Sequence, residues 1–368
     1  MKKLMISKLS TKAWSLITTL FASLLILNFS QCTFSKKNKT LSSSDSIDAK
    51  IDLGHHLFFE TRLSGNNTKS CSSCHDPQFA FSDSYRTSSG IYGDATLRNS
   101  PSLLNVKDRL SLTWSDRSIV ELEDQMVKPL FADSPAEMGA KPFERDILRR
   151  IVSDKDYKKK IQKAFPQLEL KFFSFKEIKQ CIAIYMRQLN SYQSAFDRYK
   201  FYRDSSAMSS EAIKGMKLFF SERIACSNCH GGTNLDHPEM GDHFANIGIY
   251  NCGDGNYPSS DQGEFNHSRD SIDRGSFKVP SLRNVAITSP YYHDGSEASL
   301  LEVIKQYERG GRLVSFGDCQ GEGAENPLRN SGRLEKFQLT NEERSQLLAF
   351  LHSLTDTGYL HKPLFTHP

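Results

Sequence analysis

Apolar positions recur with a helical period in several parts of the chain. Residues three or four positions apart share one face of an α-helix, so this spacing predicts amphipathic helices. We expect such helices near residues 47–58, 175–189, 210–220 and 300–309. Their predicted apolar faces include Ile47, Ile51, Leu57 and Phe58; Phe175, Ile178, Ile182, Tyr185 and Leu189; and Leu300, Val303, Ile304 and Tyr307.

Capping signals mark where two of the helices begin and where another ends. Ser174 and Glu177 form a capping-box pattern, and Thr340 and Glu343 repeat it before a helix that runs to about residue 354. Gly310-Gly311 is typical of a helix C-terminus. The stretches 62–70, 82–97, 231–243 and 250–276 are rich in Gly, Asn, Asp and Ser, and we interpret them as long loops. The pattern therefore predicts an all-α fold with little sheet.

Two short sequence segments, called the repeated phrases below, each occur twice along the chain. Gly54-His-His-Leu-Phe-Phe59 is similar to Gly215-Met-Lys-Leu-Phe-Phe220. Pro101-Ser-Leu-Leu-Asn-Val106 is similar to Pro280-Ser-Leu-Arg-Asn-Val285. Such self-similarity is typical of an internal duplication. We predict two related domains, 47–205 and 206–356, followed by a tail, 357–368.

The first 32 residues have the features of a secretion signal. A basic start with four lysines precedes an apolar run from Trp14, which is too short to span a membrane comfortably. The signal ends near Cys32 in a loose lipoprotein pattern, so Cys32 is a candidate for acylation, with ordinary cleavage nearby as the alternative. Residues 33–46, with their serines and lysines, are expected to form a flexible tether. We therefore predict a periplasmic location.

Charge gives no indication of a nucleic-acid partner. Lys and Arg number 47 and Asp and Glu number 43, and four of the lysines belong to the predicted signal. The remaining chain is nearly neutral, and no basic run is interleaved with stacking aromatics.

The most informative motif is C-x-x-C-H, which occurs at Cys71–His75 and at Cys226–His230. This spacing is the attachment signature of a c-type haem, because two thiols can add to the vinyl groups of one porphyrin while the adjacent imidazole coordinates its iron. A zinc ribbon would need its two pairs roughly 15–20 residues apart, and a redox dithiol would follow a strand. The sequence therefore predicts two covalently bound haems.

The four other cysteines have different expected roles. Cys32 belongs to the signal, and Cys181 falls on the apolar side of a predicted helix, as a buried thiol would. Cys252 and Cys319 lie in loops, where a disulfide is plausible in an exported protein, but the sequence does not establish their proximity.

With these residues the chain, over about 47 to 355, resembles the bacterial di-haem cytochrome c peroxidases, including their MauG-like branch. The resemblance implies that His75 holds a peroxidatic N-terminal haem and that His230 holds a C-terminal haem that passes electrons. Some members have a distal histidine after the first motif, and this chain has none between His75 and Asn99. The resemblance therefore implies an N-terminal haem ready for peroxide without reductive activation.

The resemblance also assigns catalytic roles. Gln125 and Pro129 would line the peroxide pocket, and Glu137 would move a proton between the two peroxide oxygens. Trp114 matches a tryptophan that lies between the haems and could relay electrons. Without the resemblance, Gln125 and Glu137 would be surface residues and Trp114 a core aromatic.

The second axial ligand of the C-terminal haem distinguishes the two branches. Peroxidases supply Met, which raises the reduction potential, and MauG-like members supply Tyr. The matching position here is Tyr307, with Met240 as the alternative ligand. An ordinary core tyrosine would also fit the helical position of Tyr307.

Calcium is the other implied cofactor. Asn99, Thr288 and Pro290 match the family's calcium site, with oxygen atoms as the only ligands. Taken alone, these are turn residues. Arg98 and Arg283 could pair with haem propionates.

These features lead to one predicted function and two alternatives. The first is a peroxidase that reduces hydrogen peroxide with electrons from an external donor, such as a cytochrome c or a cupredoxin. The second is a MauG-like enzyme that uses peroxide-derived high-valent iron to oxidise residues of a partner protein. The third is an electron-transfer cytochrome without enzyme activity.

Overall fold

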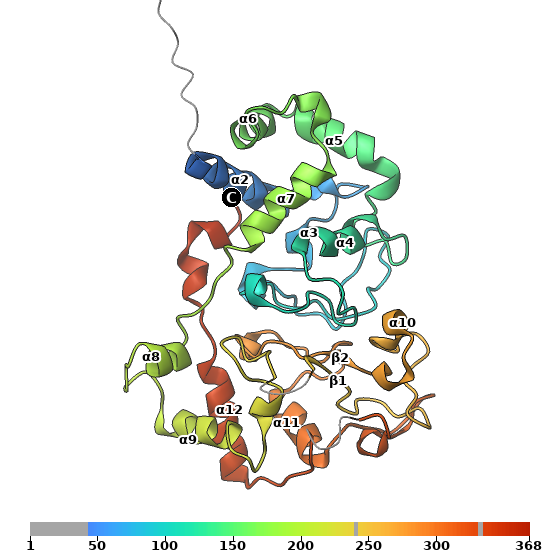
Figure 1. The fold of residues 1–368 in the computed structure, drawn as a ribbon, viewed down its shortest axis with the longest axis vertical. Coiled ribbons are helices and arrows are strands. Elements are labelled where there is room, and N and C mark those ends of the chain that lie inside the picture. The colour runs from blue at the N-terminus through green and yellow to red at the C-terminus, as the bar shows by residue number, and fades with distance from the viewer. Residues whose placement is uncertain (1–42, 239–241, 330–333) are drawn as a thin grey trace, which may run out of the picture. The chain divides into compact units, whose positions relative to one another are not determined.

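The computed structural model describes residues 43–238, 242–329 and 334–368 (Figure 1). The predicted signal at 1–32, including Cys32, and residues 33–42 of the predicted tether lie outside the described residues. The first helix begins at Ser43, so the last four residues of the predicted tether are helical. Among the described residues, no helix has both the length and the apolar character that a membrane crossing requires.

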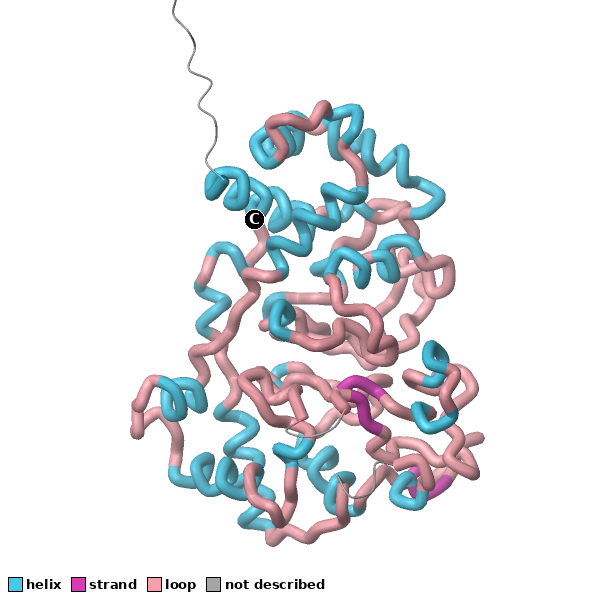
Figure 2. The backbone as a smooth tube through the Cα atoms, in the orientation of Figure 1, coloured by secondary structure: helices cyan, strands magenta, loops and turns pink. Residues whose placement is uncertain are grey.

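Helices and long loops make up most of the described chain, with four strands of two residues each (Figure 2). The prediction of a helical fold with little sheet is confirmed. The strands form two antiparallel pairs, β1 (Phe244–Ala245) with β2 (Phe277–Lys278) and β3 (Leu313–Val314) with β4 (Gly321–Glu322). The α-helices are α2 (Ser43–Phe58), α3 (Leu122–Gln125), α4 (Val127–Phe131), α5 (Glu144–Ser153), α6 (Lys155–Ala164), α7 (Phe175–Met186), α8 (Ala195–Phe201), α9 (Ser210–Phe219), α10 (Phe265–Ser268), α11 (Leu300–Arg309) and α12 (Asn341–Ser353).

Helices α2 and α7 pack closely in the first of two clusters of buried apolar residues. Gly54 makes this contact possible, because a Cβ atom there would lie 2.0 Å from the carbonyl oxygen of Cys181. Leu53 and Leu57 are fully buried, whereas Ile47 is exposed. The predicted apolar face was therefore wrong at Ile47, which lies before the stretch of α2 that packs on α7.

Helices α9 and α12 form the corresponding pair in the second cluster, and Figure 1 shows them side by side. Gly215 lies at their contact, since a Cβ atom there would lie 1.9 Å from the carbonyl oxygen of Gln346. The repeated phrase thus supplies a helix–helix contact glycine in both clusters. The division at residues 205 and 206 into two cytochrome c-like domains, and their origin by duplication, stay predictions.

Both predicted capping boxes are present, at Ser174 before α7 and at Thr340 before α12. Gly310 ends α11 in the left-handed region at φ +77°, as expected. Helices α5 and α6 were not predicted, and α10 lies inside the predicted loop 250–276. That helix has only four residues, which is too short for a helical period to be seen in the sequence.

The C-terminal segment packs against the first cluster rather than the second. It contains two 3₁₀-helices, η11 (Gly358–His361) and η12 (Pro363–Phe365). Tyr359 and Phe365 are buried among residues of the first cluster. The stretch predicted only as a tail therefore contributes to the core of the N-terminal part of the chain.

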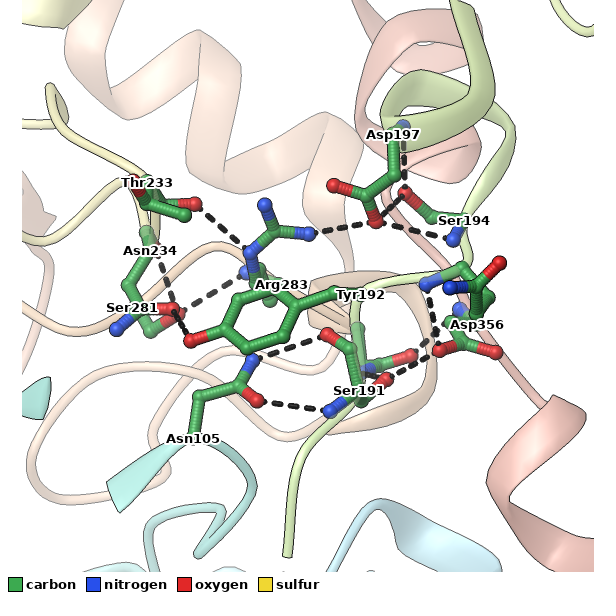
Figure 3. Close-up of polar contacts among 12 residues, drawn as sticks. Asn105, Ser191, Tyr192, Ser194, Asp197, Thr233, Asn234, Ser281, Arg283 and Asp356 are labelled. Atoms are coloured by element: carbon green, nitrogen blue, oxygen red, sulfur yellow. Dashed lines mark hydrogen bonds and ion pairs between the residues drawn. The ribbon is translucent and has the colours of Figure 1, made fainter. Parts of the chain in front are cut away.

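A buried polar network holds the connection between the two clusters (Figure 3). Asn105 and Ser191 exchange two hydrogen bonds, of 3.0 and 2.8 Å. The Ser191 hydroxyl also donates to Asp356 at 2.8 Å and accepts from Asn284 at 3.1 Å. Asn105 and Asn284 occupy equivalent places in the second repeated phrase, and both adopt left-handed backbone angles. The two copies of that phrase thus meet at one serine.

Candidate functional site

Each C-x-x-C-H motif begins with a 3₁₀-helix, η2 (Cys71–Ser73) or η7 (Cys226–Asn228). The histidine closes the turn, because its backbone N–H donates to the first cysteine's carbonyl, at 3.0 Å for His75 and 2.9 Å for His230. A tight turn of this kind keeps the two thiols and the imidazole together. The turn is therefore closed in the same way at both motifs, although the preceding residue is extended at Ser70 and left-handed at Ala225.

Both imidazoles are held in the orientation and tautomer that an iron ligand needs. His75 Nδ1 lies 2.9 Å from the Phe81 carbonyl oxygen, and His230 Nδ1 lies 3.0 Å from that of Leu235. A carbonyl oxygen can only accept, so Nδ1 carries the proton and Nε2 keeps its lone pair. Burial lowers the pKa of both histidines, which favours this neutral form.

A cavity of about 1410 Å³, counting the space at its mouth, adjoins the second motif. Cys226, Cys229 and His230 line it together with Tyr307, and most other lining residues are aliphatic or aromatic. Two thiols, an imidazole with a free Nε2 and apolar walls fit a covalently attached haem. The residues present at the second motif therefore suit the predicted cofactor.

Tyr307 lies on α11 and lines the same cavity as His230. Burial raises the pKa of its phenol, and the nearby Cys229 and Cys226 raise it further. No hydrogen bond to this hydroxyl is found within residues 43–238, 242–329 and 334–368. Met240, the alternative ligand, lies outside the described residues.

The segment predicted to line the peroxide pocket folds into one unit. Pro129 on α4 accepts a hydrogen bond from Met138 N at 3.0 Å, and Leu130 accepts one from Ala140 N at 2.8 Å. These bonds join α4 to the loop that carries Glu137. The Gln125 side chain, at the end of α3, is partly buried.

Glu137 is partly buried, and burial raises the pKa of its carboxyl. In the part of the chain that the structure describes, no hydrogen bond or ion pair to this carboxylate is present. Burial also raises the pKa of the Cys74 thiol, and the charges of Asp83 and Glu137 add to that rise. The charge of the Glu137 carboxylate therefore reaches the first haem motif, and its role in proton transfer stays a prediction.

Trp114 lies at the cavity of the second motif and also contacts the loop that follows the first. Its indole N–H donates to the Asn99 carbonyl oxygen at 2.9 Å, and its own carbonyl accepts from Lys278 N at 2.8 Å. The Lys278 ammonium lies 5.9 Å from the centroid of the indole ring. The structure thus brings Trp114 between segments that belong to the two motifs.

The sequence did not reveal two cations that are wholly or partly buried. Arg109 is partly buried and donates to the carbonyl oxygens of Ser102 and Leu104, and its buried Nε has no acceptor among the described residues. Lys278 is buried and lines the cavity of the second motif. Its ammonium group forms no ion pair with a carboxylate of the described residues. Lys278 stands between two apolar residues in Phe277-Lys-Val279, which is a signal for a buried lysine, whereas nothing in the sequence marks Arg109.

The arginines that the sequence suggested for haem propionates have other contacts. Arg98 forms two hydrogen bonds with Asp261, of 2.7 and 2.8 Å. Arg283 contacts Asp197 at 2.8 Å in the network of Figure 3, and within the described part of the chain its Nη2 has no acceptor. Buried cations without an anion are costly. Both arginines therefore have a carboxylate of the protein as their counterion.

The residues predicted to bind calcium are close along two neighbouring loops. Asn99 N donates to the His293 carbonyl oxygen at 2.8 Å, three residues beyond Pro290. The Asn99 side-chain amide donates to the Tyr85 carbonyl at 3.1 Å, and the Thr288 hydroxyl donates to Val285 O. Within the described ranges no cluster of three His, Cys, Asp or Glu residues could hold a metal ion. The calcium site stays a prediction.

The structure shows a disulfide that the sequence leaves open, and it confirms the buried thiol predicted at Cys181. Cys252 and Cys319 form a disulfide across 67 positions, next to the β3–β4 pair. Cys181 is a free, fully buried thiol on α7.

Comparison with known proteins identifies the family. A family model described as di-haem cytochrome c peroxidase matches residues 48–206. The methylamine utilization protein MauG of Methylophilus methylotrophus is 31% identical over 315 residues, which cover 84% of this chain and 83% of MauG. The chain belongs to the di-haem cytochrome c peroxidase family. The haem-binding geometry of both motifs agrees with this membership.

Two further di-haem relatives extend the comparison. Cytochrome c peroxidase Ccp of Escherichia coli is 29% identical over 308 residues, and the chain spans only 58% of that relative's length. A crystal structure of a MauG-like protein associated with microbial copper homeostasis is similar with a TM-score of 0.82 and 39% identity, over 87% of this chain and 93% of that one. The family therefore includes both peroxidases and MauG-like proteins among the relatives of this chain.

Proposed function

We propose that this protein is a periplasmic di-haem enzyme that reduces hydrogen peroxide at an N-terminal haem. Electrons would come through the C-terminal haem from an external donor such as a cytochrome c or a cupredoxin. When bound, haem iron supplies a coordination place for peroxide and a store of oxidising equivalents. Cys71, Cys74 and His75 would hold the first haem, and Cys226, Cys229, His230 and Tyr307 the second.

The observation that carries this proposal is the difference between the two sites. Glu137 brings a carboxylate without a described hydrogen-bond partner to the first motif, whereas the phenol of Tyr307 lines the cavity of the second. A carboxylate with a raised pKa can accept the proton of an incoming hydroperoxide and return it to the leaving oxygen. The second site offers a ligand instead of a proton acceptor. Peroxide chemistry is therefore assigned to the His75 side.

The remaining site residues would support this reaction. Gln125 and Pro129 would shape the pocket beside Glu137, because hydrogen bonds join α4 to the Glu137 loop. Trp114 would carry electrons between the two haems, since its contacts reach the loops of both motifs. Asn99, Thr288 and Pro290 would bind a calcium ion, and the indole N–H of Trp114 donates to the Asn99 carbonyl oxygen.

A second candidate is a MauG-like activity, in which the oxidising equivalents are used on residues of a partner protein. Two observations favour it: Tyr307 lines the same cavity as His230, where the resemblance expects the second axial ligand, and no histidine stands between His75 and Asn99. The structural relative with 39% identity is also MauG-like and is associated with copper homeostasis. A partner protein involved in copper handling would fit this candidate.

Two measurements on the haem-loaded protein test these proposals. A steady-state assay with hydrogen peroxide and a reduced cytochrome c should show turnover that Glu137→Gln lowers by at least about 100-fold. Glu144→Gln, at an exposed position in the same region, is the matched control. Negligible turnover with a long-lived oxidised protein would favour the MauG-like candidate. Two low-spin haems that do not react with peroxide would contradict both and indicate an electron-transfer cytochrome.

A further inference from the structure

The C-terminal segment reaches the loop that follows the first haem motif. Tyr359, on η11, is 1% exposed. Its hydroxyl donates to the Pro77 carbonyl oxygen at 2.8 Å and accepts from Ala80 N at 3.1 Å. One phenol from the end of the chain therefore fixes two points of the turn 77–81.

That turn has an unfavourable backbone. Ala80 and Phe81 are consecutive non-glycine residues in the left-handed region, at φ +55° and +58°. Each such residue costs on the order of 1–2 kcal/mol, so the turn persists only because its surroundings hold it. Phe81 N donates to the Asp76 carbonyl at 2.9 Å, and the Ser102 hydroxyl donates to the Ala80 carbonyl at 2.6 Å. The rings of Phe58 and Phe365 also pack on Phe81, but among the described residues only Tyr359 hydrogen-bonds to this turn with a side chain from outside residues 75–102.

The turn matters because Phe81 presents its carbonyl oxygen to His75 Nδ1, at 2.9 Å. A hydrogen bond at this nitrogen fixes the orientation of the ring and raises the basicity of Nε2 toward a metal. Ala80, which Tyr359 holds, directly precedes Phe81. A change at Tyr359 can therefore reach the iron-binding atom through two residues.

The second motif has the same arrangement without the tyrosine. Leu235, at φ +54°, presents its carbonyl to His230 Nδ1. Ser281 donates to Asn234 O at 2.6 Å, as Ser102 does to Ala80 O. The Tyr192 hydroxyl meets Asn234 there only at its side-chain oxygen, at 3.2 Å, and within the described residues no tyrosine hydroxyl bonds to the backbone of residues 231–237. The C-terminal haem site can therefore serve as an internal control when Tyr359 is changed.

We propose that Tyr359 is a positioning residue for His75, which sets the donor strength of that imidazole by holding the turn 77–81. The C-terminal segment is then part of the N-terminal haem site, although it follows the C-terminal one in the chain. This inference rests on the proposed haem at His75, and it does not depend on the reaction that the haem performs.

Tyr359→Phe in the haem-loaded protein tests the inference, because it removes the hydroxyl and keeps the buried ring. With a weaker hydrogen bond at His75 Nδ1, the iron–imidazole stretching frequency of the N-terminal haem should fall in the resonance Raman spectrum of the reduced protein. Its reduction potential should rise. The signals of the C-terminal haem should stay where they are.

Two further variants complete the design. Tyr185→Phe removes another buried hydroxyl that holds the same C-terminal segment, at Leu364 O, and should shift neither haem. Ser102→Ala loosens the same turn from the other side and should shift the N-terminal haem in the same direction as Tyr359→Phe. Unchanged N-terminal signals in both Tyr359→Phe and Ser102→Ala would overturn the inference, and so would equal shifts at both haems. Loss of peroxide turnover alone would bear on the proposed function instead.

Discussion

The ammonium group of Lys278 lies 5.9 Å from the centroid of the Trp114 ring, and a 2.8 Å backbone hydrogen bond joins the same two residues. A positive charge at this distance stabilises the neutral indole and opposes its oxidation. Because Lys278 lies on β2 and Trp114 in the loop after the first motif, their contact depends on the packing of the two loops. In the proposed relay, the Lys278 charge would therefore control how readily Trp114 carries an oxidising equivalent.

We predict that Lys278→Met makes Trp114 easier to oxidise. The substitution keeps the length and apolar character of the side chain while it removes the charge. Electron exchange between the two haems, followed by rapid-mixing absorption after addition of peroxide, should become faster by about 3- to 10-fold, which corresponds to about 1 kcal/mol. Trp114→Phe should abolish the gain. A Lys278→Met protein with unchanged exchange would show that the charge does not act on the indole.

The same contact predicts a pH dependence. Burial, together with the charge of Arg109, lowers the pKa of Lys278 to about 7, and the Asp236 carboxylate opposes the shift. His243 also lies nearby, because the Lys278 charge contributes to lowering the pKa of the His243 imidazole. Lys278 loses its proton as the pH rises through 7, so exchange in the unaltered protein should become faster between pH 6 and pH 8. In Lys278→Met this rise should be absent.

Glu137 should give the pH–rate profile of the peroxide reaction an acid limb, which is a fall in rate at low pH. As the proton acceptor it must be ionised, and burial raises its pKa above the ordinary value of 4.5. The rate of reaction with peroxide should therefore fall as the pH falls through that raised value, and Glu137→Gln should lose the limb together with most of the rate. Stopped-flow measurements between pH 4 and pH 8 check this. A limb that survives in Glu137→Gln would assign the proton transfer to another group.

The raised pKa of Glu137 also affects stability: as the pH rises, the reaction with peroxide should become faster while the folded protein becomes less stable. A carboxyl that is harder to ionise in the folded chain lowers the free energy of unfolding as the pH rises between its unfolded and folded pKa values. Glu137→Gln should therefore be at least as stable as the unaltered protein at pH 7 by thermal unfolding. A marked loss of stability would mean that Glu137 is a structural residue.

Tyr307→Met should raise the reduction potential of the C-terminal haem, because a thioether ligand favours ferrous iron more than a phenolate does. The measurement is a spectroelectrochemical titration of both haems. Tyr291→Phe is the matched control, since Tyr291 lines the same cavity and its hydroxyl is already used by the Val285 carbonyl. Identical potentials in the Tyr307→Met and unaltered proteins would exclude Tyr307 as a ligand.

Gly54→Ala and Gly215→Ala should each destabilise the fold. The added methyl group would meet a carbonyl oxygen of the neighbouring helix at 2.0 or 1.9 Å, so α2 and α7, or α9 and α12, would have to separate. Such overpacking costs about 1–3 kcal/mol, more than the helix propensity that alanine adds. Circular dichroism melting of the haem-loaded protein checks this, with Ser210→Ala at an exposed helix position as the control. Melting temperatures equal to that of the control would contradict the close packing.

Local features were predictable from the sequence because they depend on neighbouring residues. The spacing of Cys71, Cys74 and His75 is covalent, and the capping box at Ser174 needs only the next three residues. These signals led to the haem motifs and to the helix starts that the structure shows. The repeated glycine phrase likewise marked Gly54 and Gly215, although their contacts with α7 and α12 could be seen only in the structure.

The tertiary structure alone decided which distant residues act together. Tyr359 and Pro77 are 282 positions apart, and their hydrogen bond depends on the C-terminal segment returning to the first cluster. Lys278 meets Trp114, and Glu137 reaches the first motif, through loops whose paths no periodicity describes. Capping and motif spacing are short-range and leave a trace in the sequence, whereas burial and charge at a site depend on the packing of the whole chain.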